Sequence, residues 1–194
     1  MKYLKFTMKA WPVIAAATIG LCYLTQAVAK LFGIELPDQA NIDLVRQWGL
    51  HAFDSLANFG VFVFLCVQVL VLMPVIEELL FRGLIFRLPV RFLDRRQKTE
   101  NSGRTTADNG QTTEDNRRWS RCLVLIAVFS SALFSAAHYL AQPWPDAAFL
   151  ALFFFGLAQC WLYKKTDRIW CPMLNHALFN LTNLVLLFVV PQTT

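Results

Sequence analysis

Apolar stretches long enough to cross a lipid bilayer restrict most strongly how this chain of 194 residues can fold. A helix rises about 1.5 Å per residue, so a hydrocarbon core of roughly 30 Å needs about 20 apolar residues. The chain is 56% hydrophobic and holds 17 Phe and 6 Trp, so lipid is its expected solvent. We predict an all-α, polytopic transmembrane helical bundle. Its clear spans are Trp11–Phe32, Leu56–Met73, Cys122–Leu140, Ala147–Tyr163 and Ile169–Val190.

A sixth apolar stretch, Val75–Leu93, carries several charges and is harder to place. If it continued the helix that starts at Leu56, that helix would hold 38 residues and measure about 57 Å, much more than the thickness of the membrane. Pro74 lacks an N–H and clashes with the preceding turn, so we expect the helix to break there. This predicts about six spans. The alternative is five spans, with the charged stretch lying on the membrane surface.

A change of composition divides the chain. Residues 94–120 are rich in Arg, Asp, Asn, Thr, Gln and Gly and show no apolar period, which predicts a flexible polar loop. We therefore expect two amino-terminal transmembrane spans in residues 1–74. Residues 75–194 are then a core of four helices that this loop interrupts.

Basic residues bear on the orientation of the chain in the membrane. Lys2, Lys5 and Lys9 precede the first apolar stretch, as in a signal peptide, but the stretch is long enough to cross and we expect an uncleaved span. Cytoplasmic loops collect Lys and Arg, and further basic clusters follow Leu93 and Tyr163. Six spans place the amino-terminal lysines on the opposite side of the membrane from those clusters, whereas five spans place all of them on one side.

Ionisable residues at membrane depth are the first candidates for function, because each costs at least about 2.5 kcal/mol to insert. Glu78 and Arg82 stand four residues apart on one helix face and can neutralise each other, so we interpret this pair as structural. Glu77 is rotated by about 100° and lacks that partner. A carboxylate without a partner in apolar surroundings is a stronger base, as general base catalysis requires.

Histidine and asparagine residues recur at helical spacing in two later spans. Phe134 and His138 are four residues apart and share a face, although His138 alone could instead make a hydrogen bond between helices. His176 and Asn180 are also four residues apart, with Asn175 beside them. Two uncharged donors on one helix face are suited to an oxyanion hole.

Residue counts along the helices predict which of these groups can meet. Glu77 lies 17 residues before Asp94, and His138 lies 17 residues after Arg121. Both are therefore about 25 Å from the polar loop and can come together. His176 is only about 12 Å beyond the basic residues that precede its span, so we expect that span to be tilted or bent.

The three sets together resemble a known family, the CAAX prenyl endopeptidase and bacteriocin-processing membrane proteases, also called the CPBP or Abi family. Its pattern is E-E-x-x-x-R, then F-x-x-x-H, then H-x-x-x-N, on successive core helices. The resemblance covers residues 75–190, with the three motifs in the same order. It does not explain the first two spans or the polar loop.

The resemblance implies an intramembrane endopeptidase, with roles for the matched residues. Glu77 would activate a water molecule with the help of His138, and His176 with Asn180 would stabilise the oxyanion. The residues that would support the site are Glu78, Arg82, Phe134 and Asn175.

The resemblance implies a site without a cofactor, in which the glutamate activates water directly. The sequence has no H-E-x-x-H motif. The alternative is a zinc-dependent protease in which Glu77, His138 and His176 bind the metal and leave the fourth position open.

The same resemblance implies two kinds of partner: membrane lipid, and a membrane-anchored peptide or protein as substrate. The substrate is prenylated or unmodified, and no nucleic acid is expected to bind. We expect a multi-pass protein of the plasma membrane of a prokaryote. A transporter is a rival interpretation, but it predicts internal repeats that we do not find. A non-catalytic membrane chaperone or immunity protein is another, although every matched motif position is filled.

Overall fold

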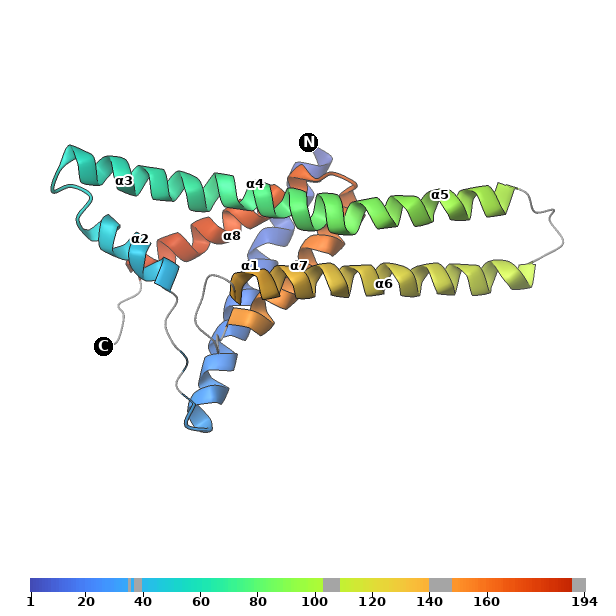
Figure 1. The fold of residues 1–194 in the computed structure, drawn as a ribbon, viewed down its shortest axis with the longest axis horizontal. Coiled ribbons are helices and arrows are strands. Elements are labelled where there is room, and N and C mark those ends of the chain that lie inside the picture. Colours follow the sequence, from blue (N-terminus) through green and yellow to red (C-terminus); the bar gives the residue numbers. More distant parts are fainter. Residues whose placement is uncertain (35, 37–39, 103–108, 140–147, 190–194) are drawn as a thin grey trace.

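The computed structural model describes residues 1–34, 36, 40–102, 109–139 and 148–189, and within these ranges it contains helices and no strands. The prediction of an all-α, polytopic helical bundle is confirmed, and the expected number of about six spans is roughly consistent with it (Figure 1). The elements are α1 (Lys2–Leu31), α2 (Ala40–Leu50), α3 (Leu56–Val67), η1 (Gln68–Leu72), α4 (Met73–Glu78), η2 (Leu79–Arg87), α5 (Leu88–Ser102), α6 (Asn109–Tyr139), α7 (Ala148–Thr166) and α8 (Trp170–Val189).

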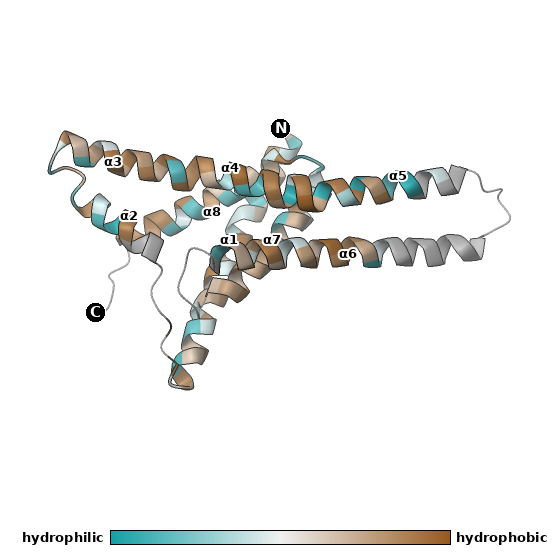
Figure 2. Ribbon diagram, viewed as in Figure 1, coloured by the Kyte–Doolittle hydropathy of each residue, from teal (hydrophilic) through white to brown (hydrophobic). Residues whose placement is uncertain are grey.

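Four of the described helices are long and apolar enough to cross a membrane: Lys2–Leu31, Leu56–Arg96, Ser120–His138 and Trp170–Val189. The apolar residues dominate α3, α4 and the inner half of α6, whereas α5 becomes hydrophilic toward its end (Figure 2). Most of the large apolar side chains on these helices are exposed, as expected for surfaces that face lipid. The chain is an integral membrane protein.

The expected break at Pro74 is wrong, because the chain is helical without interruption from Leu56 to Ser102. Two segments of this helix, η1 and η2, are π-helical, and η1 ends directly before α4. In a π-helical turn the N–H bonds to the carbonyl five residues earlier, as Met73 does to Gln68. The wider turn accommodates the proline ring without a break in the helix axis.

The expected polar loop is also shorter than predicted. Residues 94–102 continue α5 and residues 109–120 begin α6, so helix occupies most of the polar segment; residues 103–108 lie outside the described residues. Arg, Gln, Lys and Glu are good helix formers even where no apolar face is present. As a result α5 and α6 extend side by side, well beyond the other helices (Figure 1).

The apolar core is built from aromatic side chains that meet where the helices cross. Phe81 of η2, Phe134 of α6, Phe155 of α7 and Phe179 of α8 pack together. Helix α1 adds Ile14 and its neighbour Ala15 to the same cluster. The first helix is therefore an integral part of the bundle, and this core lies directly beside the candidate site.

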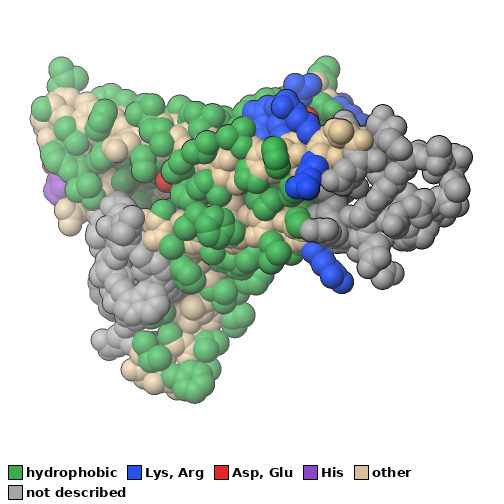
Figure 3. Space-filling model, turned by 45° about the vertical axis from the view of Figure 1, so that its right-hand side comes forward, with side chains coloured by type: hydrophobic (Ala, Val, Ile, Leu, Met, Phe, Trp, Pro, Cys, Tyr) green, Lys and Arg blue, Asp and Glu red, His purple; other side chains and the backbone are tan. Residues whose placement is uncertain are grey.

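The basic clusters lie at one end of the molecule. The three lysines at the start of α1 line a cavity together with Lys165, at the end of α7. Lys164 lines a second cavity with Arg87 and Arg91. On the face shown in Figure 3, the Lys and Arg side chains gather toward one end of the described surface, and apolar side chains cover most of the rest of that surface. Six separate spans would have placed the amino-terminal lysines and the later basic clusters on opposite sides of the membrane. Because Leu56–Ser102 is a single helix, all of these clusters lie at the same end of the bundle.

Candidate active site

An ion pair fully buried in the bundle forms the base of the candidate site. Arg82 Nη1 lies 3.1 Å from Glu78 Oε1, and neither side chain is exposed. Arg82 also donates a hydrogen bond of 3.2 Å to the carbonyl of Gly156 on α7, and its guanidinium lies 4.3 Å from the centre of the Phe134 ring. The pair expected from the four-residue spacing is therefore formed, and it joins η2 to α6 and α7.

Gly156 allows the close approach that this arrangement requires. A Cβ atom at this position would lie 2.9 Å from the Cβ and 3.1 Å from the Cα of Ser131 on α6. Any larger residue would push α6 and α7 apart, because the second contact is with backbone rather than with a movable side chain. The absence of a side chain at Gly156 thus brings its carbonyl within reach of Arg82.

His176 is held between the two adjacent glutamates. Its Nδ1 lies 3.0 Å from Glu78 Oε1, and its Nε2 lies 3.8 Å from Glu77 Oε2. The rings of Phe155 and Phe134 flank the imidazole, at centroid distances of 5.1 and 5.9 Å. Glu78 therefore fixes the orientation of the histidine ring and directs its other nitrogen toward Glu77.

Glu77 differs from Glu78 in accessibility and in its partners. Its side chain is 18% exposed, whereas that of Glu78 is completely buried. Glu77 Oε2 accepts no hydrogen bond from the described residues. This agrees with the expectation that Glu77 lies off the face of the ion pair. Oε2 is buried, so the exposed part of the side chain lies at its other atoms.

His138 lies on α6, which packs against η2 one turn from Glu77. Its Nδ1 donates a hydrogen bond of 2.9 Å to the carbonyl of Phe134, and the two rings are 4.8 Å apart. Phe81 packs edge to face on Phe134, so η2 and α6 are in register there. Glu77 lies one turn before Phe81, and His138 lies one turn after Phe134. Because the helix that contains Glu77 and helix α6 run in opposite directions, Glu77 and His138 lie at the same level.

The imidazole that the structure places beside Glu77 is thus that of His176, which the sequence assigned to the oxyanion. The tilt of α8 accounts for this, because α8 crosses the long Leu56–Ser102 helix obliquely and brings its middle to α4 (Figure 1). Residue counts along straight helices placed His176 lower than Glu77, and the tilt that the sequence analysis expected for this span makes up the difference. No ion pair or hydrogen bond joins Glu77 to His138 in the part of the chain that the structure describes.

Asn180 makes a contact that the sequence analysis missed. Its Nδ2 donates a hydrogen bond of 2.8 Å to the carbonyl of Val69. In the π-helical register that carbonyl would accept from the residue five positions later, which is Pro74 and has no N–H. Asn180 therefore satisfies the backbone acceptor that the proline leaves free. A proline in an apolar helix and an asparagine in another were the only signals available in the sequence.

Two fully buried amide side chains lie in the same bundle. Neither Asn175 on α8 nor Gln159 on α7 has a hydrogen-bond partner for its amide nitrogen or oxygen among the described residues. The sequence analysis named Asn175 but overlooked Gln159. Its signal was present, since a glutamine in the otherwise apolar run before Trp161 is costly to bury without a purpose.

The residues proposed as zinc ligands do not form a metal site in this structure. The described residues include no group of three or more His, Cys, Asp or Glu side chains that could hold a metal ion. Both nitrogens of His176 face glutamates, and Nδ1 of His138 is used by a backbone carbonyl. Of the three proposed ligands, Glu77 and His176 face each other at 3.8 Å, and no hydrogen bond or ion pair among the described residues joins His138 to either.

A cluster of glutamate and histidine, buried among apolar helices at membrane depth, defines a polytopic membrane protein with an intramembrane polar site. A family model for type II CAAX prenyl endopeptidases of the Rce1-like type matches residues 59–182. The chain belongs to this Rce1-like family. Comparisons with curated proteins and with solved structures gave no match.

The matched range includes every candidate residue from Glu77 to Asn180. It begins at residue 59, inside α3, so the family's domain takes in most of the continuous helix before Pro74. Membership of this family indicates a membrane-embedded hydrolase with CAAX-type endopeptidase activity.

Proposed function

We propose that this protein cleaves a peptide bond of a membrane-anchored, prenylated substrate, using a water molecule that Glu77 activates. The observation that carries the proposal is the position of the Glu77 carboxylate. The side chain is partly exposed, its buried Oε2 accepts no hydrogen bond from the residues that the structure describes, and this atom lies 3.8 Å from Nε2 of His176. Two groups at that separation can both contact one water molecule at about 2.8 Å.

The proposed reaction begins with proton transfer from this water to Glu77. The water oxygen then attacks the carbonyl carbon of the scissile bond and produces a tetrahedral oxyanion. When the C–N bond breaks, Glu77 returns the proton to the leaving amine. His138 supports the first step: because its Nδ1–H is given to Phe134, the neutral ring keeps Nε2 as an acceptor for the second water proton.

The oxyanion is assigned to His176 and Asn180. Glu78 holds Nδ1 of His176, and this contact directs Nε2 of the ring toward the position proposed for the oxyanion. Asn180 uses one N–H on Val69 and retains a second. Arg82 takes no direct part in this scheme. It neutralises Glu78, so that Glu77 is the carboxylate that remains free to accept a proton.

The proposal can be tested with purified protein in lipid vesicles and a pair of fluorogenic peptides that differ only in the prenyl group. Wild type should cleave the prenylated peptide, with and without a strong chelator. Glu77→Gln should lose activity by about 10²-fold or more, since a general base contributes on that order.

Asp54→Asn is the matched control, because this carboxylate is 63% exposed and pairs with His51 away from the site. It should leave kcat/KM unchanged. Activity that the chelator abolishes and zinc restores would replace the glutamate mechanism by a metal site. Equal cleavage of both peptides would contradict the proposed preference for prenylated substrates.

A further inference from the structure

A second polar site lies outside the candidate active site, at the basic end of the bundle. A cavity of about 240 Å³ opens between the η2–α5 segment and the end of α7. Arg87 is nine residues beyond Glu78 along the same helix, and neither Glu78 nor Arg82 lines the cavity, so the cavity is separate from the ion pair. Its lining residues are Arg87, Val90, Arg91, Asp94, Tyr163, Lys164 and Asp167.

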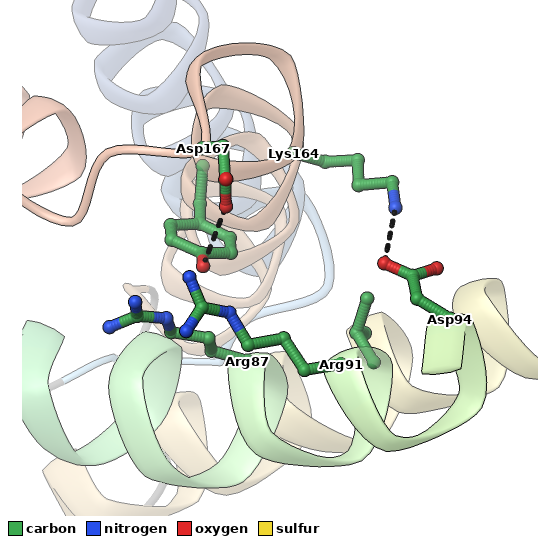
Figure 4. Close-up of a pocket in the computed structure, with 7 residues that line it drawn as sticks. Arg87, Arg91, Asp94, Lys164 and Asp167 are labelled. Atoms are coloured by element: carbon green, nitrogen blue, oxygen red, sulfur yellow. Dashed lines mark hydrogen bonds and ion pairs between the residues drawn. The ribbon is translucent and has the colours of Figure 1, made fainter. Parts of the chain in front are cut away.

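The charges in this cavity are not balanced. Asp94 lies 3.7 Å from Lys164, and Asp167 accepts a hydrogen bond of 3.1 Å from Tyr163. Figure 4 shows the side chain of Arg91 extending from the neighbouring helix toward Asp167, whereas that of Arg87 extends along the helix, away from Asp94 and Lys164. Neither arginine has a carboxylate within 4 Å among the residues that the structure describes, and Nε of Arg87 is buried without a hydrogen-bond partner. Two guanidinium groups are therefore available to an anion.

The surroundings of the cavity indicate the kind of anion. Leu84, Leu88 and Phe92 are 53%, 54% and 67% exposed, and they lie on the same helix as the two arginines. A ligand whose charge enters the cavity would thus lie beside an apolar, lipid-facing surface. Arginine forks match the oxygens of a phosphate group, and basic pockets between membrane helices bind acidic lipid headgroups.

We propose that Arg87 and Arg91 bind the phosphate of an anionic phospholipid, with the acyl chains lying on the exposed leucines and Phe92. Phosphatidylglycerol is a suitable probe, because its phosphate carries the only charge of the headgroup. A choline headgroup would bring a cation close to two guanidinium groups and bind less well. The site needs no assumption about the protease reaction.

The test is native mass spectrometry of the full chain in detergent, with titration of phosphatidylglycerol, phosphatidylcholine, diacylglycerol or inorganic phosphate. Wild type should retain phosphatidylglycerol in preference to the other three. Arg87→Gln/Arg91→Gln should raise its Kd at least tenfold, because a hydrogen bond to a charged group contributes about that much. The exposed Arg91 allows the single Arg91→Gln variant as a second measurement if the double variant folds poorly.

Arg95→Gln/Arg96→Gln is the matched control, since it removes the same charge from the same helix at positions that do not line the cavity. It should bind phosphatidylglycerol like wild type. Equal weakening by the two double variants would overturn the site in favour of general attraction to a basic surface. If inorganic phosphate displaced phosphatidylglycerol completely at the same concentration as the lipid, the lipid would be ruled out as the ligand. The cavity would then be a binding site for a free anion only.

Discussion

The hydrogen bond from Asn180 to the Val69 carbonyl gives a prediction in which two distant positions depend on each other. Asn180→Leu removes the donor with little change of volume and leaves a partly buried backbone acceptor without a partner. The penalty for such a group is about 1–3 kcal/mol, although hydrogen bonds between membrane helices average only about 0.6 kcal/mol. Because Pro74 removes the backbone donor as well, we expect a loss of about 1–2 kcal/mol of unfolding free energy.

Pro74→Ala should cancel most of this loss. In the π-helical register Ala at position 74 supplies an N–H to Val69, and in an α-helical register Met73 does so. The cost of Asn180→Leu should therefore fall to a few tenths of a kcal/mol in the Pro74→Ala background. Reversible unfolding in mixed micelles, followed by circular dichroism, measures all four members of this double-mutant cycle.

Peptidase activity provides the control for this cycle. If Asn180 also contributes to the oxyanion hole, the double variant should regain stability without regaining kcat. Additive losses of stability, with no coupling between positions 74 and 180, would refute the explanation of how the helix passes through Pro74.

Three further predictions concern the packing of the site and its surroundings. Arg82→Met should cost about 3–5 kcal/mol of unfolding free energy, since it leaves Glu78 as a buried charge without its cation; the same unfolding assay measures it, and a loss below about 1 kcal/mol would contradict the role of the pair. Gly156→Ala should cost about 1–3 kcal/mol because of the contact with Ser131, whereas Gly60→Ala, where nothing lies within 4 Å, should be neutral or stabilising by up to about 1 kcal/mol. Phe134→Ala should cost about 3–5 kcal/mol and also lower kcat, because its ring contacts both His138 and His176; normal kcat in the folded variant would show that the ring does not position the histidines.

What could be predicted from the sequence is local to single helices. Apolar length predicted the helices, and a spacing of four residues predicted the pair of Glu78 with Arg82. Both features depend on a helix repeat that is the same wherever the helix lies. The sequence also predicted that Glu77 and His138 lie at the same level. Both positions were counted in residues from the same connection between two adjacent helices.

The remaining features depend on how helices cross. Steric arguments about Pro74 considered one helix alone, and the carbonyl that the proline leaves free is satisfied by Asn180, which is 111 residues beyond Val69. The tilt of α8, which brings His176 to both glutamates, is set by packing against α1, α4 and α7 rather than by its own sequence. The sequence could therefore predict that the glutamates and histidines lie near one another. It could not predict which histidine contacts which glutamate.

The most direct test of the account compares two adjacent carboxylates by measuring both kcat/KM and unfolding free energy. Glu77→Gln should lose about 10²-fold or more in kcat/KM and unfold like wild type, since the side chain is partly exposed and Oε2 accepts no hydrogen bond from the described residues that the substitution could remove. Glu78→Gln should lose several kcal/mol of stability, because it leaves Arg82 buried as an uncompensated charge. Retention of activity within a few-fold in Glu77→Gln would contradict the assignment of Glu77 as the general base.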